Sequence, residues 1–125
     1  MKRLFLTLAA ISFAGGAYAA GCAKPRNAFD DVYCSGNLFA QVDHDLNSEY
    51  ATLQKRLSTG QQAMLKRSQV SWIRQRDAAC SETKESGFFV NLDCAVDMTQ
   101  QRLAFLRERE RECNSTGCAE SKLGQ

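Results

Sequence analysis

The chain has 125 residues, and its 16 Lys and Arg nearly balance its 14 Asp and Glu, for a formal net charge of +2. This balance supplies no global field that would recruit nucleic acid or an anionic membrane surface, and we exclude both as partners. A chain of this length is expected to form one small domain, which buries only about two-thirds of its unfolded surface.

Residues 1–19 have the features of a secretory signal peptide. Two basic residues precede an apolar run, residues 4–14, that is shorter than the roughly 20 residues needed to span a bilayer. An A-x-A cleavage site then ends at Ala19. We expect residues 20–125 to form a single exported domain. The two basic residues are lost with the signal, so that domain carries 14 basic and 14 acidic residues.

Cys22 raises an alternative, because lipoprotein precursors are cleaved directly before a cysteine in such a position. Those signals usually have a large aliphatic residue three positions earlier, where this chain has Ala19. Lipidation would also leave five cysteines for pairing, whereas six can pair fully. We therefore expect a soluble protein, in the periplasm or secreted, with six oxidised cysteines: Cys22, Cys34, Cys80, Cys94, Cys113 and Cys118.

Helical periodicity dominates the mature chain, and strand-like alternation is not evident. The first predicted helix lies between Gly36 and Gly60, with Gly60 as its C-cap. Its inward row is Phe39, Asp43, Leu46, Tyr50, Leu53 and Leu57, with Val42 beside it.

Two more helices are predicted, over about residues 61–79 and 92–112. Their apolar positions are Met64, Leu65, Val70, Trp72 and Ile73 in the second, and Leu92, Val96, Leu103 and Leu106 with Thr99 in the third. The short connection at residues 58–60 predicts an αα-hairpin, and residues 81–93 form a long polar loop. The expected fold class is all-α, a small disulfide-bonded three-helix bundle built on that αα-hairpin.

Polar residues share the inward face of the second helix. Gln69, Trp72, Arg76 and Cys80 form one row. Folding the chain about residues 59–60 brings Asp43 opposite Arg76 and Tyr50 opposite Gln69. We expect a largely buried Asp43–Arg76 ion pair that fixes the register, with Gln69 bonded to the Tyr50 hydroxyl. The alternative is that Asp43 and Arg76 line a ligand site.

The length of the third helix, about 30 Å, separates Cys113 from Cys94 and predicts a Cys113–Cys118 bond. The hairpin places Cys80 near the start of the first helix. This favours Cys34–Cys80 with Cys22–Cys94, while Cys22–Cys34 with Cys80–Cys94 stays open.

These motifs resemble a known family. The chain combines C-x11-C at Cys22 and Cys34, the Asp43…Tyr50 segment, the Gln69-Trp72-Arg76-Cys80 row, a further Cys94 and a T-x2-R motif ending at Arg102. Together they are similar to the LprI-type lysozyme inhibitor N-terminal domain family, over about residues 22–106. The resemblance implies an exported, helical, disulfide-bonded domain, and the family takes its name from a lysozyme inhibitor. Cys113 and Cys118 lie beyond the shared region.

No constellation for catalysis or metal binding stands out, and we expect neither an enzyme nor a cofactor. His44 and the adjacent Asp45 would not face each other on a helix. The expected function is that of an exported binding protein that inhibits a lysozyme-type glycoside hydrolase by steric occlusion. Its candidate contacts are Lys84, Phe88 and Phe89 in the long loop, although the alternative is that one or both phenylalanines cap the bundle's end. The second reading is a periplasmic accessory, envelope or immunity-like protein with a non-lysozyme partner.

Processing gives the first testable prediction. The intact mass of the exported protein should correspond to a chain that begins at Ala20 or Gly21, without lipid, because the A-x-A site directs cleavage there. A diacylglycerol adduct on Cys22 would refute this prediction.

Overall fold

The computed structural model describes Cys22 and residues 24–125, so the predicted signal peptide and its cleavage site lie outside the described residues. The elements are α1 (Ala28–Gln54), α2 (Thr59–Cys80), β1 (Ser81–Lys84), β2 (Gly87–Val90), α3 (Leu92–Ser115) and α4 (Glu120–Leu123). Within this part of the chain, no helix is both long and apolar enough to cross a membrane.

Each long helix begins at a side chain that caps its first turn. The Asn27 side chain accepts hydrogen bonds from two backbone N–H groups of α1, and Asn91 accepts one from Cys94 N–H in α3. At the start of α2, Ser58 and Gln61 form a reciprocal capping box. These caps satisfy N–H groups that a helix end otherwise leaves without partners.

The Asn27 cap makes the first helix longer than the sequence predicts. Gly36, expected before its start, lies inside α1, and apart from its chain neighbours and the backbone of its own helix nothing lies within 4 Å of where its Cβ would be. Gly60, expected as a C-cap, is instead in the first turn of α2. A glycine inside a helix costs about 1 kcal/mol relative to alanine, a penalty that a capped helix of 27 residues can absorb.

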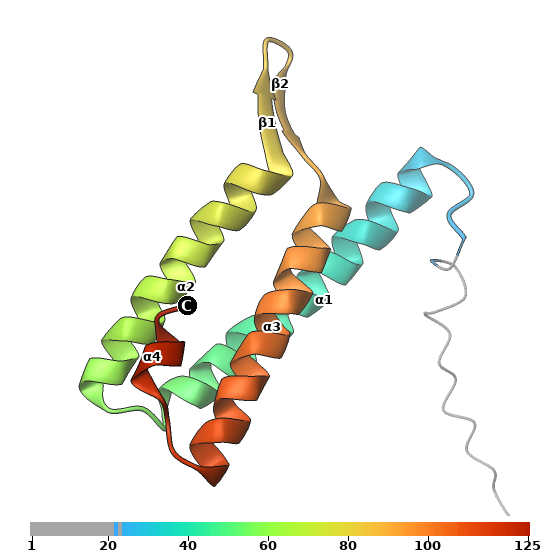
Figure 1. Ribbon diagram of the computed structural model, residues 1–125. Helices are drawn as coiled ribbons and strands as arrows, with labels where there is room; N and C mark the ends of the chain where they lie inside the picture. The colour runs from blue at the N-terminus through green and yellow to red at the C-terminus, as the bar shows by residue number, and fades with distance from the viewer. Residues whose placement is uncertain (1–21, 23) are drawn as a thin grey trace, which may run out of the picture.

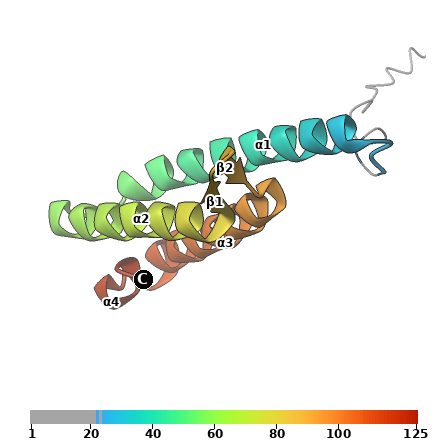
Figure 2. The ribbon, with the colours of Figure 1, turned by 90° about the horizontal axis from the view of Figure 1, so that it is seen from above.

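The three long helices form a bundle whose main interface is between α1 and α3. Contacts of α2 with α3 are fewer, and α4 packs against α2 (Figure 1). The expected helical domain is therefore present, but its closest packing is not the αα-hairpin of α1 and α2 that the sequence predicts. The N-terminal end of α1 extends past the other helices in both views (Figures 1 and 2), where Phe29 is 89% exposed.

Leucines from all four helices form the core. Two aliphatic side chains that the sequence predicts to lie inward, Val70 and Ile73, are instead 39% and 37% exposed, because α2 turns only a narrow face toward its neighbours. The buried cluster comprises Val42, Leu46, Leu53, Leu57, Leu65, Leu103, Leu106 and Leu123.

Residues 81–90 form an antiparallel β-hairpin rather than the predicted polar loop, so the fold is mainly but not wholly helical. Ser81 pairs with Val90, and Lys84 pairs with Gly87. Gly87 has φ 132°, a conformation that side-chain-bearing residues rarely adopt, and it permits the tight turn. The hairpin stands beyond the ends of α2 and α3 (Figure 1).

Three disulfides join neighbouring cysteines in the sequence: Cys22–Cys34, Cys80–Cys94 and Cys113–Cys118. The predicted Cys113–Cys118 bond is confirmed. The favoured pairing of Cys34 with Cys80 is wrong, and the alternative pairing is the one observed. The reason is that α1 starts early, so that Cys34 lies in its projecting end while Cys80 meets the start of α3.

Glu49 is an acidic group in an unfavourable position on α1. Its side chain is only 17% exposed, and its Oε1 has no hydrogen-bond partner. Burial, and then the neighbouring carboxyl of Glu110, raises the pKa of Glu49, although Arg107 lies 4.0 Å from its other oxygen. The folded state therefore holds the Glu49 proton more tightly than the unfolded state does, and folding weakens as pH rises through that range.

Glu49→Gln should consequently raise the melting temperature at pH 7, because an amide carries no charge to desolvate. The gain should shrink toward zero at about pH 3.5, where both states of the wild type are protonated at this position. Thermal unfolding at the two pH values measures it, with Glu85→Gln in the exposed hairpin turn as the matched control. An equal gain at both pH values would contradict the assignment.

Candidate functional site

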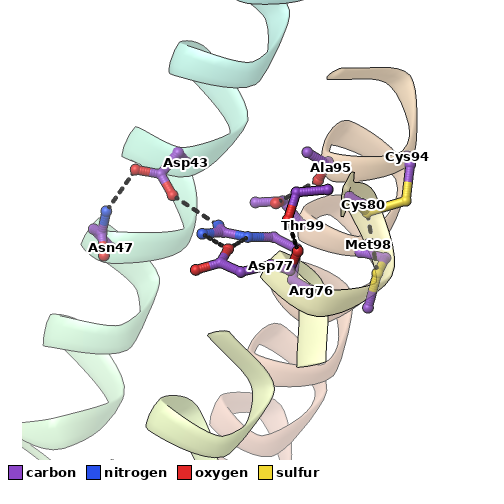
Figure 3. A network of polar contacts seen from close by, with 10 residues as sticks. Asp43, Asn47, Arg76, Asp77, Cys80, Cys94, Ala95, Met98 and Thr99 are labelled. Carbon is purple, nitrogen blue, oxygen red and sulfur yellow. Dashed lines mark hydrogen bonds and ion pairs between the residues drawn. A yellow bond between two sulfur atoms is a disulfide. The ribbon is translucent and has the colours of Figure 1, made fainter. Parts of the chain in front are cut away.

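Arg76 lies between two carboxylates at the upper part of α2 (Figure 3). One guanidinium nitrogen is 3.6 Å from Asp43 Oδ1 on α1, and the other is 2.9 Å from Oδ1 of the adjacent Asp77. The guanidinium carbon also lies 5.4 Å from the ring centroid of Phe39 and 5.1 Å from that of Trp72. Arg76 is thus held by charge and by stacking on two aromatic rings.

The predicted Asp43–Arg76 pair is present, but only one member is largely buried. The Arg76 side chain is 14% exposed, whereas that of Asp43 is 40% exposed and accepts a hydrogen bond from Asn47. Solvent therefore screens the Asp43 carboxylate, and Asp77 remains as a second partner for the cation.

Gln69 is buried as predicted, but its predicted partner is wrong. Its Oε1 accepts a hydrogen bond of 2.9 Å from Arg102 Nε on α3, while the Tyr50 hydroxyl accepts one from Gln54 on its own helix. Arg102 also lies 5.9 Å from the ring centroid of Trp72. Residues of the inward row of α2 therefore contact two arginines, Arg76 of the same helix and Arg102 of α3.

The β-hairpin brings the predicted contact residues together. Phe88 is 87% exposed, Phe89 44% and Val90 62%, so the alternative in which both phenylalanines cap the bundle does not hold for Phe88. The Lys84 ammonium lies 5.2 Å from the ring centroid of Phe89 and 2.7 Å from a carboxylate oxygen of Glu82. The hairpin thus presents apolar surface with one cation beside it.

A pocket of about 400 Å³ separates the hairpin from the helices. It is lined by Phe39, Arg76, Asp77, Cys80, Ser81, Phe88, Phe89, Val90 and Ala95. Cys80, whose bond to Cys94 is drawn in Figure 3, forms part of its lining. Sequence reasoning missed this pocket, because it depends on the strand pairing that the periodicity did not indicate.

The described residues contain no group of three or more His, Cys, Asp or Glu side chains that could hold a metal ion. His44 is exposed on α1. The site combines stacked arginines, a pocket and an exposed aromatic hairpin, features that suit a binding surface.

A small disulfide-bonded helical domain with a projecting, aromatic hairpin is the class that these features define. Residues 22–106 match the lysozyme inhibitor LprI family, and the chain belongs to that family. The resemblance seen in the sequence is thereby confirmed. No curated protein and no solved structure gives a significant match. The matched residues include the hairpin and Arg102, but they end before the Cys113–Cys118 bond and α4.

Replacing Arg76 should destabilise the fold more than replacing Asp43, its partner in the ion pair. Arg76→Met should destabilise the fold by about 2 kcal/mol or more, because it removes a cation stacked on two rings. Asp43→Leu should cost about 1 kcal/mol or less, since that carboxylate is half-exposed and Asp77 remains. Urea denaturation of both variants and of the double variant gives the coupling. A loss of about 3 kcal/mol or more for Asp43→Leu would instead support the largely buried Asp43–Arg76 pair that the sequence predicts.

Proposed function

We propose that the mature chain is an exported, non-enzymatic binding protein that inhibits a lysozyme-type glycoside hydrolase by occluding its cleft. The observation that carries this proposal is the β-hairpin, which projects beyond the helices with Phe88 almost fully exposed. Membership of the LprI family supports an inhibitor as the class of protein.

The hairpin has the shape and chemistry to enter such a cleft. Two paired strands lie about 4.8 Å apart and form a narrow ridge. Glycoside hydrolases of this type place two carboxyl groups at the scissile bond, one of them ionised. Lys84 offers a cation to that carboxylate, and Phe88 and Phe89 offer apolar surface to the sugar-binding walls. The hydrolase would lose access to its substrate without any chemistry by the inhibitor.

The hairpin is also held in place before binding. The Cys80–Cys94 bond links its two ends, and Asn91 N–H donates a hydrogen bond to the Cys80 carbonyl at the same level. A segment ordered in advance gives up less conformational entropy on binding, which favours affinity.

Export is part of the proposal. Three disulfides that involve all six cysteines fit an oxidising compartment. The bond between Cys22 and Cys34 uses the sulfur that a lipid would otherwise occupy, which supports an exported protein without a lipid anchor. The predicted signal at residues 1–19 would supply the route.

The proposal predicts that Phe88→Ala with Phe89→Ala weakens lysozyme inhibition by about 30-fold or more, the cost of losing an aromatic hot spot of about 2 kcal/mol. Lys84→Ala should weaken it by a smaller factor. The measurement is lysozyme turnover against inhibitor concentration, accompanied by melting temperatures, which should stay near the wild-type value because these side chains are exposed.

Phe29→Ala is the matched control, since Phe29 is 89% exposed at the far end of α1. It should leave inhibition unchanged. Full inhibition by the double hairpin variant would reject the hairpin as the contact. If the wild type does not slow lysozyme at all, and a different protein is captured from the exported fraction, the accessory or immunity-like reading takes its place.

A further inference from the structure

Arg102 on α3 is a cation in the interior of the bundle. The residue is 6% exposed, and its guanidinium carbon lies 4.5 Å from the ring centroid of Phe105 and 5.9 Å from that of Trp72. Among the described residues, no carboxylate side chain forms an ion pair with Arg102. Burial lowers the pKa of Arg102 to about 10. A charge in such a place needs polar partners on every side.

Each of its three nitrogens has a partner. Nε donates to Gln69 Oε1 at 2.9 Å, Nη2 donates to Ser68 Oγ at 2.6 Å, and Nη1 donates to the main-chain oxygen of Gln125 at 2.8 Å. The Ser68 hydroxyl donates to the same Gln125 oxygen. One oxygen atom therefore receives two donors, a guanidinium N–H and a hydroxyl. These are the groups with which proteins bind carboxylates.

The Gln125 oxygen and the side chains that bind it come from different parts of the chain. Ser68, Gln69 and Arg102 all lie within the residues that match the LprI family, whereas Gln125 follows α4, outside them. The segment is anchored two residues earlier by Leu123, which is 1% exposed in the core. Gln125 itself is exposed, so its main-chain oxygen reaches the buried Arg102 from the surface of the domain.

A shallow pocket of about 250 Å³ lies next to this oxygen. Met64, Arg67, Ser68, Ser71 and Gly124 line it. The pocket provides a second cation, Arg67, among its lining residues. It lies along α2, whereas the hairpin stands beyond the end of that helix (Figure 1).

We propose that Ser68, Gln69 and Arg102 form a carboxylate-binding site, which the Gln125 main-chain oxygen fills in this structure and which takes the carboxylate of a peptide when that segment is displaced. Gln69 orients the guanidinium, while Ser68 Oγ and Arg102 Nη1 hold the ligand oxygen. An anion suits the site because it faces a buried cation with no acidic side chain beside it. The site is independent of lysozyme inhibition by the hairpin.

The test uses the mature chain and a trimmed variant that lacks Gly124 and Gln125 but keeps Leu123 in the core. The probes are acetyl-Leu-Gly-Gln with a free carboxylate, the same peptide as its amide, and acetyl-Ala-Glu-Ala-amide. Calorimetry gives the affinities, and melting temperatures report binding independently. The free acid should bind the trimmed chain at least about tenfold more tightly than its amide, and at least about tenfold more tightly than it binds the full chain.

Ser68→Ala in the trimmed chain should weaken binding of the free acid by about tenfold, the loss of one hydrogen bond to a charged group. Ser71→Ala, a serine in the same pocket that makes no bond to the Gln125 oxygen, is the matched control and should bind as the trimmed chain does. A peptide with an internal glutamate that binds as tightly as the free acid would identify a side chain as the source of the carboxylate. Equal binding of acid and amide, or no binding to the trimmed chain, overturns the proposal.

Discussion

The bond between Cys80 and Cys94 is the constraint on which the upper half of the molecule depends. It joins the last residue of α2 to the first turn of α3 and closes a segment of 14 residues in sequence separation, a cross-link that stabilises by about 3 kcal/mol in the chain-entropy model. With its two ends fixed, the segment between them pairs as a hairpin although all but one of its strand residues are exposed. The bond thus holds the hairpin at the ends of α2 and α3, and Cys80 also lines the pocket beneath the hairpin.

Arginines stacked on aromatic rings connect the helices along the bundle. The guanidinium carbons of Arg76 on α2 and Arg102 on α3 lie 5.1 and 5.9 Å from the Trp72 ring centroid, and that of Arg109 lies 5.2 Å from the Phe105 ring centroid. At Arg76 and Arg109 the aromatic faces add to carboxylate partners, whereas no carboxylate side chain pairs with Arg102 in the described part of the chain. A small domain with few large apolar side chains in its core can thereby bury polar residues and still specify how its helices are rotated.

The sequence predicted the features that repeat with a helical period, and it failed where cross-links or a third partner decide the structure. The long helices and the Cys113–Cys118 bond follow from spacing alone. The hairpin does not, because strands exposed on both faces leave no alternating pattern. Pairing positions on the first and second helices alone places Gln69 opposite the Tyr50 hydroxyl. Its real partner, Arg102, stands on α3, whose rotation no pairing of positions on α1 and α2 can fix. Lys84, Phe88 and Phe89 were recognised as a group by composition, but their pocket was not.

The order of the disulfides has a consequence for how the protein matures. The first cysteine bonds the second, the third bonds the fourth and the fifth bonds the sixth, at sequence separations of 12, 14 and 5. Each partner therefore follows shortly behind the other as a chain is threaded through a membrane. In a chain exported as proposed, an oxidase that joins cysteines in order of emergence would produce the native set directly, and a disulfide isomerase would have nothing to correct.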